Sequence, residues 1–508
     1  MTRRTIHLLS LIFAVFAIIF VVPPILDRLN TAPLILSSQP DFVATPEKAN
    51  APNPNPSPSD AITLLVVTEK ENSLAPSLQA RPVDPTTLAN LPDYAAIDFG
   101  HHYTYVVSPD RKILAVITWT SDWSMAGKLH LIDLDTWTDT PVDLRIDNYV
   151  SDLTFSADAK KLYWTMPTVR DPVHGILRDY QLYQYDLASR HLSAVAQFPS
   201  SFLPWSQRSS SENVAIFGVP TGTDGLTEDV PRVIIVDSAK DHIMSDIRLD
   251  SVKAGQFHEQ MINATPSTGE EAWQSVNYSP GLAWDLDRNV LYIVHADEDK
   301  ITVVDLVTGS LMKQAQIRPR QPLLEWMSDL LVPAAAAKGG PWLGARVLLS
   351  GDGEHLYVFS EKTVMGLSKP VDLRVIATAG MREIAHINEL LTDFSLTPDG
   401  KSLLVVKAEV DKSYGFDALV SRDVYVLDAE SLQERGHIQI DQADQIWFDG
   451  FSPDGRYAYL RGASAQWVEG NGWTNWRTVW HSLNLNSYHL ISGGELESLY
   501  GALLHIAP

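Results

Sequence analysis

Cysteine is absent from all 508 residues of this sequence. Its absence excludes disulfide bonds, thiolate metal sites, cysteine nucleophiles and a lipid-modified cysteine at the N-terminus. Clusters of basic residues are missing as well, because no run of Lys or Arg exceeds two residues. With 39 basic and 62 acidic side chains, the formal net charge is -23, and so negative a surface repels phosphate backbones. We therefore expect no nucleic-acid partner.

Recognisable catalytic motifs are also missing. The sequence has no Gly-x-Ser-x-Gly elbow, no Walker loop, no haem-attachment motif and no Asp-rich calcium loop. The nearest candidates are His101-His102 in one expected loop and His258-Glu259 with Glu270-Glu271 in another. Adjacent residues in a loop point in different directions, so these groups make poor metal or acid–base sites. The sequence thus predicts no catalytic residue, no metal ligand and no cofactor.

What is present begins with an apolar run from Leu8 to Leu26, which follows the basic pair Arg3-Arg4. The run has ~19 residues, close to the ~20 that cross a bilayer as a helix. No small-x-small cleavage site follows it, which favours an uncleaved signal anchor at 8–26. The basic pair predicts a short cytoplasmic segment, residues 1–7, and places the rest of the chain outside a cell membrane crossed once.

Residues 27–60 are expected to be a linker. The part from 44 to 60 reads ATPEKANAPNPNPSPSD, which is rich in Pro, Asn, Ser and Ala. This composition is typical of an extended, disordered spacer. The folded domain should cover residues 61–508, and a single domain of more than ~300 residues indicates a repeat architecture.

From residue 61 onward the chain repeats a turn followed by an apolar strand. In such a turn Pro sets φ, Asp caps the turn through its side chain and Gly takes a positive φ. The clearest copies are Thr397-Pro398-Asp399-Gly400 and Ser452-Pro453-Asp454-Gly455, others begin at Ser108 and Ser350, and weaker ones at Ser156 and Asp285.

Each repeat continues with a strand that ends in Asp, a short polar turn and one more strand. These aspartates should bond backbone amides in their turns, and they stand at positions 84, 133, 186, 237, 305 and 428, with Thr378 and Asn484 in equivalent places. Eight units result, spaced as four-stranded propeller blades with loops would be. A fixed period argues against a β-sandwich. The unit at 200–250 lacks the turn motif, and without it the count falls to seven.

This pattern of turns, strands and aspartates resembles the YVTN and Tol-associated propeller repeats, relatives of the WD-repeat blades, over residues 61–508. The resemblance implies an all-β propeller of about eight, alternatively seven, four-stranded blades. It implies a fold and not a function, because such blades serve many unrelated roles.

The two ends of the repeat region predict how the ring closes. The chain stops at LLHIAP, an apolar strand followed by the place where a turn would begin. The domain starts at Pro58-Ser59-Asp60-Ala61, where such a turn would end. The C-terminal strand is therefore expected to be the missing innermost strand of the first blade, which would close the ring and hide its edges.

Long insertions are expected on one face only. If the strands of a blade are lettered a to d from the axis outward, the Pro-Asp-Gly turns join a to b and the Asp turns join c to d. The b–c loops and the d–a connections emerge on the opposite face, and all the long segments are of these kinds: 118–128, 165–180, 219–231, 251–280, 319–344, 407–422 and 462–478. Long loops on a rigid scaffold commonly carry binding residues.

Tryptophans in or beside these loops are the candidate binding residues: Trp119, Trp123, Trp273, Trp326, Trp342, Trp467, Trp473 and Trp476. They could form a stacking surface for sugars, a peptide or another protein. Alternatively, they plug gaps between loops and blades, as large aromatic side chains do well. Both readings stay open for the segment QWVEGNGWTNW at 466–476.

The sequence favours a membrane-anchored, extracytoplasmic and non-enzymatic binding or assembly module. Its partner would be a protein or glycan of the cell envelope, bound on the Trp-rich face. The alternative is a hydrolase of the lactonase or glycan-processing type on a propeller scaffold. A constellation of charged residues at the mouth of the axis would distinguish the two.

Overall fold

The computed structural model describes residues 62–68, 77–100, 103–118, 127–146, 150–170, 177–199, 201–210, 213–222, 226–260, 273–317, 342–364, 367–411, 418–441, 443–452, 454–468 and 472–496. All of them belong to one compact unit, Ala44–Pro508. The described residues form strands, bridges and turns and contain no helix. The strands assemble into eight sheets, so the expectation of an all-β fold is confirmed.

The first half of the chain supplies sheets 1 to 4, the first with three strands and the others with four. Their strands are β1 (Ile62–Thr68), β2 (Ser77–Val83) and β3 (Ile97–Gly100); β4 (Tyr103–Val107), β5 (Ile113–Thr118), β6 (Gly127–Asp133) and β7 (Thr138–Ile146); β8 (Ser151–Phe155), β9 (Lys161–Arg170), β10 (Leu177–Asp186) and β11 (His191–Gln197); and β12 (Phe202–Ser209), β13 (Asn213–Pro220), β14 (Arg232–Asp237) and β15 (His242–Arg248).

The second half supplies sheets 5 to 8, and sheet 6 carries an additional hairpin, β16–β17. The strands are β16 (Gly255–Gln260) and β17 (Trp273–Ser279); β18 (Gly281–Asp285), β19 (Val290–Val294), β20 (Lys300–Asp305) and β21 (Ser310–Gln316); β22 (Trp342–Leu349), β23 (His355–Val364), β24 (Leu367–Ala377) and β25 (Arg382–Ile387); β26 (Leu391–Leu396), β27 (Ser402–Asp411), β28 (Ala418–Asp428) and β29 (Glu434–Gln439); and β30 (Gln445–Phe451), β31 (Tyr457–Val468), β32 (Gly472–Asn484) and β33 (His489–Leu496).

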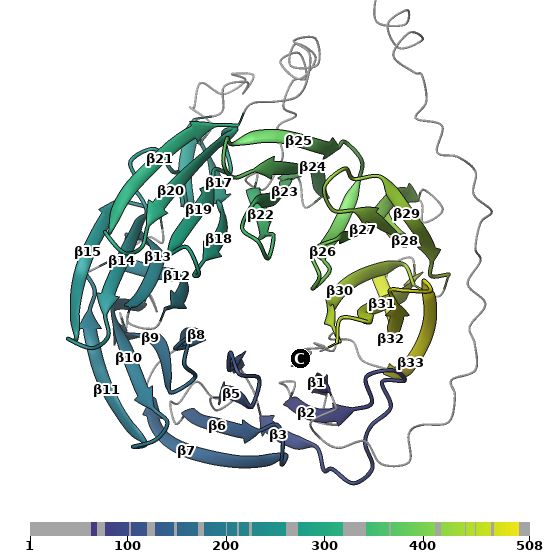
Figure 1. The fold of residues 1–508 in the computed structure, drawn as a ribbon, viewed down its shortest axis with the longest axis horizontal. Coiled ribbons are helices and arrows are strands. Elements are labelled where there is room, and N and C mark those ends of the chain that lie inside the picture. The colour runs from purple at the N-terminus through teal and green to yellow at the C-terminus, as the bar shows by residue number, and fades with distance from the viewer. Residues whose placement is uncertain are drawn as a thin grey trace, which may run out of the picture. The chain divides into compact units, whose positions relative to one another are not determined.

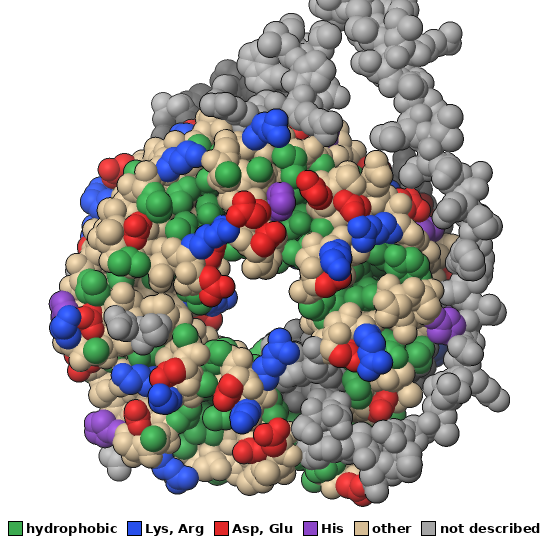
Figure 2. Space-filling model, viewed as in Figure 1, with side chains coloured by type: hydrophobic (Ala, Val, Ile, Leu, Met, Phe, Trp, Pro, Cys, Tyr) green, Lys and Arg blue, Asp and Glu red, His purple; other side chains and the backbone are tan. Residues whose placement is uncertain are grey.

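Within this unit the sheets follow one another around a central axis, as the blades of a propeller do (Figure 1). In each four-stranded set the first strand lies nearest the axis and the fourth lies at the rim (Figure 1). The space-filling view shows an opening at the centre, with acidic and basic side chains around it (Figure 2). The fold is therefore propeller-like.

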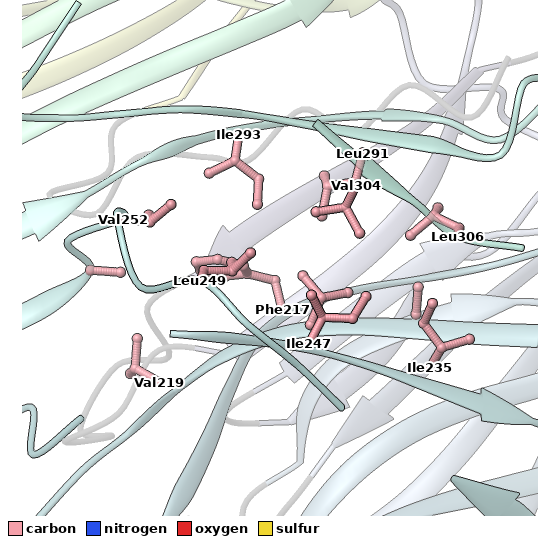
Figure 3. Packing of buried hydrophobic residues seen from close by; sticks show 13 residues of the cluster. Phe217, Val219, Ile235, Ile247, Leu249, Val252, Leu291, Ile293, Val304 and Leu306 are labelled. Atoms are coloured by element: carbon pink, nitrogen blue, oxygen red, sulfur yellow. The ribbon is translucent and has the colours of Figure 1, made fainter. Parts of the chain in front are cut away.

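Neighbouring sheets pack face to face through shared hydrophobic clusters. The cluster between sheets 4 and 5 includes Phe217, Ile235 and Leu291 (Figure 3). Comparable clusters join every successive pair from sheets 1–2 to sheets 7–8. Because sheets 2 to 7 are each covered on both faces, their middle strands are apolar at consecutive positions, and β13 is buried from Val214 to Pro220.

The turn chemistry predicted for the start of each repeat is confirmed. The Thr397 hydroxyl donates to Asp399 Oδ1 at 2.7 Å and accepts from the Ser402 amide at 3.0 Å, and Gly400 has a φ of 70°. The same bonds occur at Ser108, Ser156, Ser350 and Ser452. In the copy at 285–288, by contrast, Asp285 itself accepts the Arg288 amide, at 2.9 Å.

The aspartates between the third and fourth strands accept hydrogen bonds from backbone amides of their turns, as predicted. Asp428 Oδ1 accepts the amides of Glu430 and Ser431 at 3.1 and 2.8 Å. The Ser431 amide, opposed by burial and helped by the Ser431 hydroxyl and Arg435, lowers the pKa of Asp428 to about 2. Backbone amides donate equivalent hydrogen bonds to the side chains of Asp84, Asp133, Asp186, Asp237, Asp305 and Asn484. Thr378 differs, because its hydroxyl donates to the carbonyl of Gly353 at 2.9 Å.

The repeat at 200–250, which lacks the turn motif, nevertheless forms a complete four-stranded sheet, β12–β15. Its strands pair in sequence order, from Phe202 opposite Pro220 to Asp237 opposite His242. A motif-poor turn is sufficient here because the apolar runs of β13 and β14 pack against both neighbouring sheets.

Several segments expected to be loops are paired strands instead. Within 462–478, β31 and β32 continue their ladder as far as Val468 opposite Gly472, and the segments 165–180 and 407–422 likewise continue β9–β10 and β27–β28. Alternating polar and apolar residues let these strands pair beyond the point where the inner strand ends. The loop assignment was therefore wrong for most of these residues.

Within the segment 251–280, which was expected to be a loop, the described residues 255–260 and 273–279 are paired strands. Strands β16 and β17 pair with each other, and β17 runs parallel to β22 through Asn277 opposite Trp342. The Thr227 amide of sheet 4 donates to the Gln256 carbonyl at 2.9 Å. The hairpin therefore connects sheets 4 and 6.

Sheet 1 meets sheet 8 through a hydrogen bond from the Tyr459 hydroxyl to the Pro85 carbonyl, at 2.8 Å. The expected closing strand, 499–508, lies outside the described residues, as do the anchor at 8–26 and the linker at 27–60. Within the described part of the chain, no helix is long and apolar enough to cross a membrane.

Candidate functional site at the inner wall

The structure divides the eight candidate tryptophans into separate groups. Trp273 and Trp342 lie on β17 and β22 of the enlarged sheet 6, and Trp467, Trp473 and Trp476 lie on the single hairpin β31–β32. Trp467 and Trp473 are directly opposite each other in the ladder. Trp119, Trp123 and Trp326 lie outside the described residues.

Of the weak catalytic candidates, the structure describes His258 and Glu259. His258 and Glu259 are neighbours on β16 and pair with Ser275 and Gln274 across the hairpin. His101-His102 and Glu270-Glu271 lie outside the described residues. Among the residues that are described, no group of three His, Cys, Asp or Glu side chains could hold a metal ion.

A set of charged residues on the first strands, which sequence reasoning missed, lines the wall of the central opening. Asp152 lies on β8, Asp393 on β26 and Asp449 on β30, all nearest the axis (Figure 1). We define the inner-wall cluster as the members of this set and their partners in sheets 6 to 8: Arg346, Asp393, Trp447, Asp449 and Arg461.

Asp393 is the most fully bonded member of the inner-wall cluster. Its Oδ1 accepts from Arg346 Nη2 and from its neighbour's amide, Phe394, both at 2.9 Å. Its Oδ2 accepts the amide of Phe448 on the next sheet at 2.8 Å. The side chain is only 8% exposed, so these bonds replace lost hydration. Asp393 thereby links sheets 6, 7 and 8.

Asp449 contrasts with Asp393 because its bonding is incomplete. It is the extra residue of a β-bulge, since Phe448 pairs with Leu460 while Gly450 pairs with Tyr459. Its Oδ1 lies 3.7 Å from Arg461 Nη2, and its Oδ2 has no hydrogen-bond partner although the side chain is only 7% exposed. An unsatisfied buried carboxylate oxygen of this kind requires a physical explanation.

Both arginines of the cluster lie over aromatic rings. The Arg346 guanidinium carbon is 5.1 Å from the ring centres of Phe359 and Phe394, and that of Arg461 is 5.1 Å from Trp447. Cation–π contacts of this geometry hold a guanidinium in place without consuming its hydrogen bonds. Two carboxylates and two guanidinium groups therefore share one stretch of wall.

The pKa of Asp449 differs strongly from that of an ordinary carboxyl group. Burial raises the pKa of Asp449 to about 7; the positive charge of Arg461 opposes this rise and the negative charge of Asp393 adds to it. Burial, together with the nearby Asp449, also raises the pKa of Tyr105 on β4. A carboxyl group with such a pKa can accept or donate a hydrogen bond near neutral pH.

The sequence contained a signal for part of this set. Asp152 and Asp393 each stand four residues before the Ser or Thr that opens the next turn, inside strands that are otherwise largely apolar. An acidic residue at a fixed place in an inner strand is costly unless it is bonded, so its recurrence indicates a role. Asp449 is displaced from this spacing by its bulge, which obscures the pattern.

No protein-family model matches this chain, and no curated protein does. Similar solved structures include dihydro-heme d1 dehydrogenase NirN in complex with DHE, with 12% identity over 91% of this chain and 78% of that chain, and a TM-score of 0.48. Another is the β-propeller domain of Cps50 (Swd1) from Myceliophteria thermophila, with 11% identity over 72% of this chain and 93% of that chain, and a TM-score of 0.39. The propeller-like architecture of this chain rests on its own sheet topology.

Proposed function

We propose that this chain is a non-enzymatic binding or assembly module that uses the face carrying the extended hairpins. This hairpin face is formed by the outer ends of β9–β10, β23–β24, β27–β28 and β31–β32. The opposite face carries the short turns that begin at Ser or Thr and at Asp. The partner is a protein or glycan, as the sequence led us to expect.

The proposal is supported by the length of these hairpins and by the continuous pairing of their strands. Strands β31 and β32 have 12 and 13 residues where the inner strand of their sheet has 7, and β27 and β28 have 10 and 11 against 6. Their ladders hold the projecting ends in fixed positions, for example through Asp411 opposite Ala418. Rigid projections on a ring favour recognition of a shaped partner.

The second candidate, a glycan-processing hydrolase, is favoured by one observation. Such enzymes use two carboxyl groups in different environments, and the inner wall brings Asp449, with its raised pKa, near the fully bonded Asp393. Asp393, however, uses both oxygens to hold neighbouring strands together. This structural role leaves neither oxygen of Asp393 free for water or substrate, so the structure favours binding over hydrolysis at this wall.

Site-specific photo-crosslinking in cells tests the binding proposal. A photoreactive amino acid replaces Trp467 or Trp473 on the hairpin face, and the matched controls replace the exposed Asp110 or Thr136 on the turn face. We expect one crosslinked partner from the hairpin positions and none from the controls. Equal capture from both faces, or none from the hairpin positions of a folded protein, would contradict the proposal.

We further propose, on the sequence alone, that residues 8–26 anchor the protein in the cell membrane with the propeller outside. Labelling of single introduced cysteines in intact spheroplasts tests this anchoring.

A further inference from the structure

The outer rim of sheets 4 and 5 carries an unusual group of apolar side chains. Within the described part of the chain, four large apolar side chains are exposed: Val307 by 58%, Met312 by 56%, Met244 by 46% and Leu311 by 45%. Met244 lies on β15, and the other three lie on β21 and in the turn before it. Soluble proteins rarely group such side chains on one surface unless the surface binds something. We call Val307, Leu311 and Met312 the rim patch.

The rim patch stands on a fixed base. Asp305 Oδ1 accepts the amides of Val307 and Thr308, both at 2.8 Å, which holds the turn in place. The Ser245 hydroxyl of sheet 4 donates to the Gly309 carbonyl at 2.8 Å. A Cβ added at Gly309 would lie 2.4 Å from Ser245 Oγ, so the two sheets meet closely here. A partner would therefore find the patch already formed, which lowers the entropic cost of binding.

The patch borders an open strand edge. Strand β21 is the last strand of its sheet and pairs with β20 along one edge, and within the described residues no strand pairs with its other edge. All of its side chains are exposed except the half-buried Ala315. An open edge presents backbone N–H and C=O groups that can pair with an added strand. The edge therefore fits an extended segment of polypeptide.

Strand β29, the outer strand of sheet 7, shows how β21 differs from a protected edge. Both strands contain a β-bulge at the same place in the sheet. The extra residue of the bulge in β29 is Arg435, which forms an ion pair with Asp428. In β21 the extra residue is Met312. Charged side chains on an edge hinder the addition of a strand, and β21 has an apolar side chain where β29 has a charged one.

The charge of β21 indicates the chemistry of its partner. Lys313 is the middle residue of Ser310–Gln316 and its single charged residue, and it forms no ion pair with any described residue. If a second copy paired antiparallel along the whole strand, Lys313 would lie opposite itself, which is unfavourable. The net charge of -23 also repels a second copy. The edge therefore favours a different chain, with a carboxylate opposite Lys313.

We propose that β21 accepts an extended segment of a partner protein as a fifth strand of sheet 5. The segment pairs through its backbone with residues 313–316, beyond the bulge. Its apolar side chains cover Leu311 and Met312, and a carboxylate lies opposite Lys313. This site is on the rim, so the inference does not rest on the binding proposed for the hairpin face.

Two fluorescent synthetic peptides test the proposal with the full-length protein. Each has the 7 residues of β21's length and alternates Val and Thr, with Glu at the centre of one peptide and Lys at the centre of the other. Fluorescence anisotropy should show tighter binding of the Glu peptide, by about fivefold. Lys313→Glu should reverse this preference. Lys112→Glu, at an exposed turn position of sheet 2, makes the same change of net charge and should leave the preference as it is.

Two further measurements separate strand addition from simple apolar contact. Met312→Ser should weaken the binding of both peptides alike, because each covers the rim patch. A Glu peptide with alternate backbone amides N-methylated cannot complete the ladder and should bind at least about tenfold more weakly. If the methylated peptide binds as tightly as the unmodified one, strand addition is wrong.

Other results would also overturn the proposal. These are the absence of saturable binding for both unmodified peptides, and a preference for the Glu peptide that persists in Lys313→Glu. Sedimentation of the full-length protein examines the competing occupant, a second copy. A dimer that Met312→Ser dissociates would assign the edge to self-association, whereas we expect the same copy number for the unchanged protein and the variant.

Discussion

Single carboxylates on the inner strands control how neighbouring sheets meet. Asp393 forms an ion pair with Arg346 and accepts a hydrogen bond from the backbone amide of Phe448, so it joins three successive sheets at one point. Hydrophobic faces can slide past each other at little cost, whereas a bonded carboxylate has only one favourable position. The inner aspartates therefore supply directional bonds that the apolar clusters between the sheets lack.

The residue Asp393 gives a direct test of this role. Asp393→Ala removes the acceptor of the Phe448 amide and of Arg346. We expect the free energy of unfolding to fall by about 1–3 kcal/mol in urea denaturation. The control, Asp287→Ala at an exposed turn position, should change it by less than about 0.5 kcal/mol. A loss equal to the control would show that the inner-wall bonds contribute nothing to stability.

The pKa of Asp449 predicts a pH dependence with a definite sign. A folded-state pKa of about 7, against about 3.9 in the unfolded chain, means that between these values the folded protein binds more protons. Stability therefore falls as pH rises from about 4 to 7. Asp449→Asn, which cannot titrate, should remove this fall.

Midpoints of thermal unfolding at pH 4, 5, 6 and 7 give the comparison. If Asp449→Asn leaves the profile unchanged, Asp449 does not titrate in this range.

At the scale of the element, the inner strands β18 and β22 lie so close together that Gly281 has no room for a side chain. A Cβ added at Gly281 on β18 would lie 2.3 Å from Val347 Cγ2 and 3.1 Å from the Ala345 carbonyl on β22. Gly281→Ala should therefore destabilise the fold by about 1–3 kcal/mol. At Gly351 the same methyl group would meet nothing within 4 Å, so Gly351→Ala is the matched control. Equal midpoints for the two variants would show that β18 and β22 separate easily.

The strands and turns were largely predictable because their signals are local. The turn at Thr397 needs only a hydroxyl, an Asp and a residue able to take positive φ, all within four positions. Arg111 and Ala159 take that conformation without being glycine, with φ of 62° and 57°, so weak copies of the motif fold in the same way.

The hairpins and the inner-wall cluster were not predictable because their partners lie far apart in the sequence. Whether β17 continues into a loop or pairs with β22 depends on residues about 65 positions away, at Trp342. Asp393 looks like an isolated charge until the amide of Phe448, 55 residues later, is placed beside it. A polar residue inside an apolar strand signals such a bond but does not identify its donor.

At the scale of the whole molecule, the first sheet determines the face on which the N-terminal region joins the ring. Ile62 begins β1 opposite Val83, directly beside the Asp84 turn. The chain therefore enters at the turn face, and the hairpin face lies on the opposite side. If residues 8–26 anchor the protein as we propose, we expect the hairpin face to be accessible to an external partner.

Absence of cysteine makes this topology testable by labelling single introduced cysteines with a membrane-impermeant maleimide. Glu409→Cys, at an exposed position of β27 on the hairpin face, should be labelled in intact spheroplasts as fully as after detergent treatment. Thr5→Cys, before the apolar run, should be labelled only after detergent, because the paired arginines favour an inside N-terminus. Thr136→Cys on the turn face should react more slowly than Glu409→Cys while the membrane is intact, and at a similar rate once it is dissolved. Labelling of Thr5→Cys in intact spheroplasts would contradict the anchor. Faster labelling of Thr136→Cys than of Glu409→Cys would contradict only the orientation, because the two readouts depend on different parts of the chain.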